Sequence, residues 1–92
     1  MRSLRVAAVQ LRCGIDPAAN RAHALPFIRE AATAGARLIA TPENTYRLDR
    51  DRERSLAAAG PEQGDAELEA WARLAKEHGV WLLLGSAAIA TE

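Results

Sequence analysis

Three short apolar runs alternate along the chain with segments in which apolar residues recur at helical spacing. The runs cover residues 4–11, 37–41 and 80–85, and turn-forming Gly and Pro residues lie close to their ends. Short apolar runs with such boundaries favour buried β-strands. Between them, apolar residues three and four positions apart predict helices that begin after Asp16 and after Asp65.

The ends of the predicted helices carry the residues that helix termini prefer. Asp16 and Asp65 are suited to the N-cap, and Gly35 and Gly79 to the left-handed position that follows a helix. Pro26 interrupts the first helical segment, because proline deletes a backbone hydrogen bond at a cost of about 3 kcal/mol. The sequence therefore predicts either a kink before Pro26 or a helix that begins later.

The order of the predicted elements is strand, helix, strand, helix, strand. Such alternation indicates an α/β fold with parallel strands. Residues 46–54 carry alternating charges, which is typical of a solvated loop or of the first turns of a helix that runs to Ala59.

The third predicted strand is apolar on both faces, and parallel sheets are normally covered on both sides. Two substantial helices are too few to provide that cover in a chain of 92 residues. Trp71 and Trp81 are large apolar side chains that we expect in the core. We therefore expect residues 1–92 to be the N-terminal portion of a single larger domain.

The composition excludes several classes of protein. Twelve basic residues balance twelve acidic ones, whereas a nucleic-acid binder would carry a basic stripe. The single cysteine, Cys13, excludes an internal disulfide framework and a Cys-rich zinc site. The sequence has neither a signal peptide nor an apolar run long enough for a membrane span. We expect a cytoplasmic protein with no nucleic-acid or membrane partner.

The peptide TPEN at residues 41–44 follows the second predicted strand. Ligands of parallel α/β sheets bind beyond the carboxyl ends of the strands, and Pro42 gives the turn a rigid backbone. A partly desolvated carboxylate of Glu43 at this edge would have a raised proton affinity and could act as a general base. An exposed loop glutamate is the alternative, and a side chain in bulk water with no concavity beside it would argue against catalysis.

Four segments, RVAAVQL, IREAATAGA, LIATPEN and GVWLLLGSAAI, occur in this order between Leu4 and Glu92. Together they resemble the N-terminal part of the nitrilase superfamily of carbon–nitrogen hydrolases. TPEN and GVWLLLGS are most similar to the branch that hydrolyses deaminated glutathione, with the ω-amidase branch as its near neighbour. The resemblance implies an α-β-β-α sandwich, of which this chain would form part of one sheet and its outer helices.

The resemblance also implies a Glu-Lys-Cys triad in which Glu43 is the glutamate. The family's lysine and cysteine belong to motifs further downstream than these four segments, so we expect the 92-residue chain alone to be inactive. Cys13 follows the first strand and is interpreted as a small half-buried thiol, and Lys76 as a solvated cation at a helix end. The resemblance implies a small-molecule amide substrate, a homodimer or larger assembly, and no metal or organic cofactor.

The remaining candidate residues have two interpretations each. Tyr46 could line the mouth of a substrate pocket or pack against its neighbours. Asn44 could orient Glu43 or hydrogen-bond within its own turn. His23 is expected to be exposed and His78 to occupy a helix end. The alternative function is a non-catalytic α/β module that binds a ligand or partner through the uncovered sheet at residues 81–84.

Overall fold

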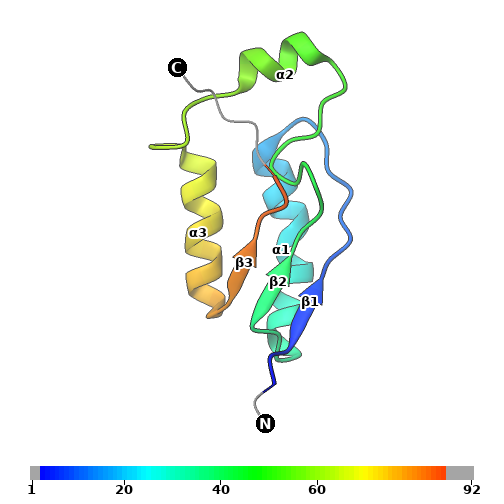
Figure 1. The fold of residues 1–92 in the computed structure, drawn as a ribbon, viewed down its shortest axis with the longest axis vertical. Helices are drawn as coiled ribbons and strands as arrows, with labels where there is room; N and C mark the ends of the chain where they lie inside the picture. The colour runs from blue at the N-terminus through cyan, green and yellow to red at the C-terminus, as the bar shows by residue number, and fades with distance from the viewer. Residues whose placement is uncertain (1–2, 87–92) are drawn as a thin grey trace.

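The computed structural model describes residues 3–86. Its elements, in chain order, are β1 (Val6–Ala8), α1 (Pro17–Thr33), β2 (Leu38–Ala40), α2 (Arg52–Ala58), α3 (Ala66–His78) and β3 (Trp81–Leu83) (Figure 1). The predicted α/β class and β-α-β-α-β order are confirmed, and the charged segment after β2 contains the short helix α2. Residues 87–92, the last part of the segment that carries the family resemblance, lie outside the described residues.

The three strands form one parallel sheet in the order β1-β2-β3. Val6, Leu38 and Trp81 occupy one row across it. Each strand has three residues, fewer than the apolar runs predict. Backbone hydrogen bonds nevertheless continue past the strand ends, because the N–H of Val9 donates to the Ala40 carbonyl at 3.0 Å.

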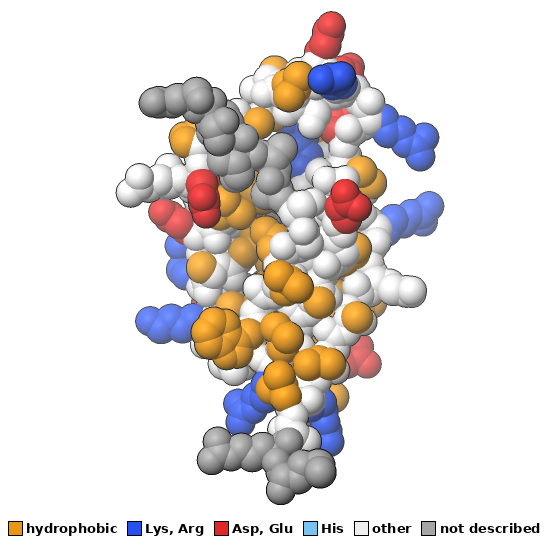
Figure 2. Space-filling model, in the orientation of Figure 1, with side chains coloured by type: hydrophobic (Ala, Val, Ile, Leu, Met, Phe, Trp, Pro, Cys, Tyr) orange, Lys and Arg blue, Asp and Glu red, His pale blue; other side chains and the backbone are white. Residues whose placement is uncertain are grey.

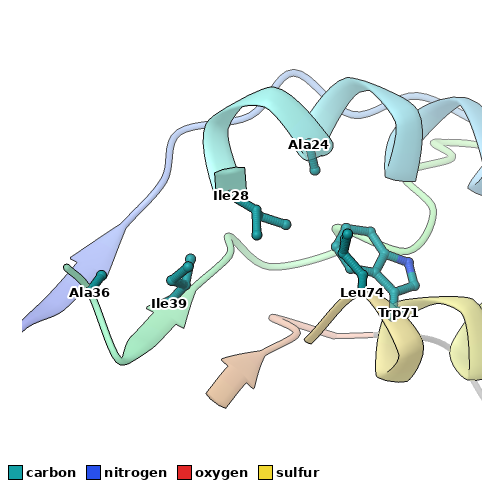
Figure 3. Packing of buried hydrophobic residues seen from close by; sticks show 6 residues of the cluster. All are labelled: Ala24, Ile28, Ala36, Ile39, Trp71 and Leu74. Atoms are coloured by element: carbon teal, nitrogen blue, oxygen red, sulfur yellow. The ribbon is translucent and has the colours of Figure 1, made fainter. Parts of the chain in front are cut away.

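Helices α1 and α3 cover the same face of the sheet, and the core lies between them and β2 (Figure 3). An Arg21–Glu67 ion pair with an Nε–Oε2 distance of 2.9 Å joins the two helices at the surface. Most of the core comes from α1 and α3. Its buried apolar residues are Ala24, Ile28, Ala36, Ile39, Trp71 and Leu74.

Helix α1 begins at Pro17 and continues through Pro26 to Thr33. The prediction of a later start is therefore wrong. Ala22 and Pro26 are both exposed, so water can reach the carbonyl oxygen that loses its hydrogen-bond donor. This access to solvent explains how the helix accommodates an internal proline.

The predicted helix ends are confirmed. The Asp16 carboxylate accepts from the N–H of Ala18 at 3.0 Å, and Asp65 accepts from the N–H groups of Glu67 and Leu68. Gly79 follows α3 at φ 63°, in the left-handed region. Local capping chemistry thus fixes where α1 and α3 begin and where α3 ends.

The face of the sheet opposite α1 and α3 has no cover among residues 3–86. Its side chains alternate with those of the core face, which leaves Val6 59%, Trp81 79% and Leu83 58% exposed. Figure 2 shows hydrophobic side chains gathered on this face. The expectation that Trp81 belongs to the core is therefore wrong for this chain, whereas Trp71 is buried as predicted. The described part of the protein is a two-layer structure with one open sheet face.

Candidate functional site

Glu43 lies in a turn beyond the carboxyl end of β2, the position that the sequence predicts. Pro42 precedes it and fixes one backbone dihedral angle of the turn. Thr45 is fully buried, and its hydroxyl donates to the Pro42 carbonyl. The backbone on which the carboxylate stands is therefore held from within.

Thr41 joins the start of the turn to the end of β3. Its N–H donates to the Leu83 carbonyl at 3.0 Å, and its hydroxyl donates to the same oxygen at 3.1 Å. The Thr41 hydroxyl also accepts from the N–H of Gly85 at 2.8 Å. Thr41 is buried, so these bonds are shielded from competing water.

Asn44 joins the other side of the turn to Ser86. Its N–H donates to Ser86 Oγ at 2.7 Å, and Ser86 Oγ donates to Asn44 Oδ1 at 3.2 Å. Asn44 has φ 58°, a left-handed conformation that asparagine tolerates better than most residues. The hydrogen bonds of Asn44 thus run to Ser86, in the segment after β3, and not to another residue of its own turn.

The Glu43 carboxylate is exposed. Five pockets lie within residues 3–86 whose linings do not include Glu43. The expectation of partial desolvation beside a concavity is therefore not met by the described residues. What the fold provides is a fixed backbone for the carboxylate rather than a pocket around it.

Tyr46 is half-buried and its hydroxyl donates to the Asp65 carboxylate, 2.8 Å from Oδ2. It lines a shallow pocket of about 320 Å³ with residues 60–61 and 63–67, which does not contain Glu43. Burial, followed by the hydrogen bond to Asp65, raises the pKa of Tyr46 to about 12. The Tyr46 hydroxyl thus stays protonated at neutral pH and donates a hydrogen bond to Asp65, the N-cap residue of α3.

Asp65 has a pKa below its ordinary value. Burial alone would raise it, but hydrogen bonds from the N–H of Leu68, the Tyr46 hydroxyl and the N–H of Glu67 outweigh that effect. The carboxylate therefore stays charged at neutral pH and connects the start of α3 to the segment after the Glu43 turn.

Asn20 connects two loops at the carboxyl edge of the sheet. Its side chain accepts from the N–H of Gly14 at 2.7 Å and donates to the carbonyls of Gly14 and Tyr46 at 2.8 and 3.0 Å. Asn20 is 4% exposed. Asn20 lies in the first turn of α1, and its side chain fixes the backbone at Tyr46, three residues beyond Glu43.

Cys13 and Lys76 do not complete a triad with Glu43. Cys13 follows β1 and burial raises the pKa of its thiol, whereas a nucleophilic cysteine needs a lowered pKa. Lys76 is exposed in the last turn of α3, which precedes the start of β3. Because the strands are parallel, Lys76 lies at the opposite end of the sheet from Glu43.

The arginines that follow the turn are engaged with an acidic residue. Arg47 Nη2 lies 2.9 Å from Asp49 Oδ2, and Arg54 Nε lies 2.6 Å from the same oxygen. The hydrogen bond from Arg54 is the main cause that holds the pKa of Asp49 well below its usual range. Both guanidinium groups are thus used to fix the loop before α2.

The two histidines have local structural partners. His23 is exposed, and its Nε2 accepts from the N–H of Arg12 at 3.1 Å. His78 Nδ1 lies 2.9 Å from the Leu74 carbonyl in the last turn of α3. Within the described part of the chain, no three His, Cys, Asp or Glu side chains form a group that could hold a metal ion. In the same residues, no helix is both long and apolar enough to cross a membrane.

The sequence interpretation missed the residues that hold the turn. Thr41 begins TPEN, and Gly85 and Ser86 end GVWLLLGS, but the sequence assigned none of these residues a role in holding the turn. Asn20 lies in no motif. A usable signal was the Gly-Ser pair at the carboxyl end of a strand adjacent to β2. Small and hydroxylated residues at that place indicate that another backbone approaches closely.

Comparisons with known proteins identify the family. Residues 5–91 match the sequence model of the Carbon-nitrogen hydrolase family, so the chain belongs to this family. Two proteins of Mycobacterium tuberculosis, Hydrolase MT0498 of strain CDC 1551 / Oshkosh and Hydrolase Rv0480c of strain ATCC 25618 / H37Rv, are each 50% identical to it over 42 residues. Each match covers 46% of this chain and 15% of the relative.

Proposed function

We propose that this chain is the N-terminal part of an amidase that hydrolyses the C–N bond of a small-molecule amide and releases ammonia. In this reaction Glu43 accepts the proton of a cysteine thiol, and the thiolate attacks the amide carbonyl carbon. A lysine stabilises the oxyanion of the tetrahedral intermediate, which collapses to a thioester as ammonia leaves with the proton. Water that Glu43 deprotonates then hydrolyses the thioester to the acid and regenerates the thiol.

The observation that carries the proposal is the position of Glu43 in a member of this family. The carboxylate follows Pro42 at the carboxyl edge of a parallel sheet, where α/β proteins place their sites. The described residues supply only the glutamate of the three groups. The proposal places the lysine and the nucleophilic cysteine in motifs downstream of residue 92.

The exposure of Glu43 sets a requirement on the complete protein. A carboxylate that takes a proton from a thiol needs partial desolvation to raise its proton affinity. In the proposed enzyme, further polypeptide covers the turn and provides that environment. The bare apolar face of the same sheet, on which Trp81 is 79% exposed, supports the presence of another layer.

The decisive experiment is the Glu43→Gln substitution in the intact gene product, with ammonia release as the readout. Removing a general base lowers turnover on the order of 10²- to 10⁴-fold. Glu62→Gln is the matched control, because Glu62 is an exposed glutamate outside this turn. Wild-type turnover in the Glu43→Gln variant would remove Glu43 from the mechanism. An intact coding sequence with no lysine and cysteine motifs after residue 92 would remove the enzyme altogether.

Deaminated glutathione is the proposed substrate, on the strength of the resemblance of TPEN and GVWLLLGS to that branch. Arg47 and Arg54 are not assigned to binding the acidic groups of this substrate, because both guanidinium groups pair with Asp49. Ammonia release from deaminated glutathione, from a simple aliphatic amide and from a nitrile distinguishes the branches. A preference for the nitrile would overturn the amidase assignment and keep the family.

The non-catalytic alternative predicts a different outcome. Its supporting observation is the open sheet face with Trp81 and Leu83 exposed. A binding module of this kind would release no ammonia from any of the three compounds. It would fold as a soluble 92-residue chain, and its amide NMR spectrum would be well dispersed.

A further inference from the structure

The turn that bears Glu43 belongs to no helix or strand, so its position depends on its contacts with other segments. Ser86 provides the contact nearest to Glu43 on the C-terminal side. Its hydroxyl both accepts from the N–H of Asn44 at 2.7 Å and donates to Asn44 Oδ1 at 3.2 Å. A hydroxyl can make both bonds at once because it has one donor and two acceptor positions.

The same residue also contacts the turn through its backbone. The Ser86 carbonyl accepts from the N–H of Tyr46 at 3.4 Å. Ser86 thus contacts the chain one and three residues beyond Glu43, whereas Thr41 fixes it two residues before through Leu83 and Gly85. The backbone on both sides of Glu43 is therefore held by the end of β3 and the residues that follow it, Leu83 to Ser86.

We propose that Ser86 is a positioning residue for Glu43: its hydroxyl fixes the Asn44 backbone and so determines where the carboxylate stands relative to the sheet. This inference rests on the proposed function, because it assigns Ser86 a part in the same reaction. Ser86 has no contact with the carboxylate itself among the hydrogen bonds of the described residues. Its effect on turnover is indirect, through the geometry in which the base meets the thiol.

The test uses three variants of the intact protein. Ser86→Ala removes both bonds to Asn44, and Ser86→Thr keeps the hydroxyl. Ser55→Ala is the matched control, because Ser55 lies in α2, away from this turn. Steady-state ammonia release gives kcat and KM for each variant, and thermal unfolding followed by circular dichroism gives Tm.

We expect Ser86→Ala to lower kcat on the order of 10- to 100-fold, because a small misplacement of a catalytic group has effects of this size. KM and Tm should stay near the wild-type values, and Ser86→Thr should recover most of the lost kcat. Ser55→Ala should match the wild type in all three quantities. A wild-type kcat in Ser86→Ala would overturn the proposal, as would a loss that Ser86→Thr does not recover.

A fourth variant, Asn44→Gly, addresses the outcome in which Ser86→Ala also lowers Tm. Asn44→Gly removes the Oδ1 contact while glycine adopts the left-handed conformation at no cost. Because the backbone N–H of residue 44 still donates to Ser86 Oγ in this variant, a kcat well above that of Ser86→Ala supports the proposal, and a kcat as low as that of Ser86→Ala overturns it.

Amide hydrogen exchange separates this proposal from the proposed function. If Ser86 holds the turn, the Asn44 amide exchanges faster in Ser86→Ala than in the wild type. An unchanged exchange rate overturns the positioning role even where Glu43→Gln abolishes turnover. Faster exchange together with full activity of Glu43→Gln would instead show that the turn is held but does not carry the base, which overturns both proposals.

Discussion

The backbone carbonyl of Pro42 occupies the space in which Gly85 would carry a side chain. A β-carbon on Gly85 would lie 1.8 Å from the Pro42 oxygen and 2.8 Å from the backbone nitrogen of Glu43. Both contacts are with main chain, which cannot rotate away as a flexible side chain can. The close approach of these two backbones explains why the exit of β3 carries a glycine.

Replacing Gly85 with alanine should therefore displace the Glu43 turn. We expect the free energy of unfolding to fall by about 1–3 kcal/mol, the usual effect of forcing an extra carbon into a packed place. Ammonia release by the intact protein should fall as well. Gly60→Ala is the control, since a β-carbon there would meet nothing within 4 Å. Equal stability of the two variants in urea unfolding would contradict the close approach.

Asn20→Ala should destabilise the protein by about 2–3 kcal/mol, because the buried Asn20 side chain makes three hydrogen bonds that alanine cannot make. The partners in these bonds are the N–H and carbonyl of Gly14 and the carbonyl of Tyr46. Arg29→Ala, at an exposed position of the same helix, should change stability by less than about 0.5 kcal/mol. Urea unfolding of both variants measures the difference, and a loss in Asn20→Ala no larger than in the control would be evidence against this network.

Tyr46 is the single tyrosine of the chain, so its titration can be followed directly by the ultraviolet absorbance of tyrosinate. We expect a midpoint near 12 in place of the ordinary 10.0. Because the folded pKa is raised, the stabilisation from the protonated hydroxyl is complete below pH 10 and is lost as the pH rises through 12. Circular dichroism at the midpoint checks that the protein is still folded.

Asp65→Asn tests the origin of that shift, since asparagine still caps a helix but carries no charge. The Tyr46 midpoint should fall only part of the way to 10.0, because burial is the larger cause. A midpoint that does not move would show that the Asp65 charge has no part in the shift. At the acid end of the pH scale, the charged Asp65 carboxylate stabilises the fold. Because its folded pKa is lowered, this stabilisation is complete above the unfolded pKa of about 3.9. It is lost as the pH falls through the lowered folded pKa.

The open sheet face should make the 92-residue chain self-associate. Replacing both Trp81 and Leu83 with threonine keeps strand propensity and removes apolar surface. We expect the double variant to sediment as a monomer under conditions in which the wild-type chain forms larger species. Leu56→Gln is the control, because Leu56 is 65% exposed but lies in α2. A wild-type chain that is monomeric and binds no hydrophobic dye would contradict the prediction.

Local chemistry accounts for the parts of the fold that the sequence predicts well. Asp16, Asp65 and Gly79 act within a few residues of their own positions, so their roles are visible in the sequence. The turn after β2 is predictable for the same reason, because Pro42 ends the strand directly. The position of Glu43 could therefore be predicted, while its exposure depends on which layers surround the sheet.

The errors arise where distant segments decide the outcome. In the sequence, Asn20 is indistinguishable from any other polar helix residue. Its role depends on the folded chain, which brings the loops that contain Gly14 and Tyr46 to its side chain. Trp81 alternates with Leu82 along β3, and only the packing of α1 and α3 on one face determines that Leu82 points inward and Trp81 outward. Neither relationship is encoded within a short stretch of sequence.

The hydrogen bond between Asn44 and Ser86 spans 42 positions of the chain, and this separation has a consequence for biosynthesis. Until Ser86 has been synthesised, the segment around Glu43 lacks its contacts with the segment that follows β3. It can adopt its final conformation only after β3 has emerged and paired with β2, because contacts of this sequence separation form after local ones. The Glu43 turn is thus among the last parts of this domain to reach its final conformation in the nascent chain.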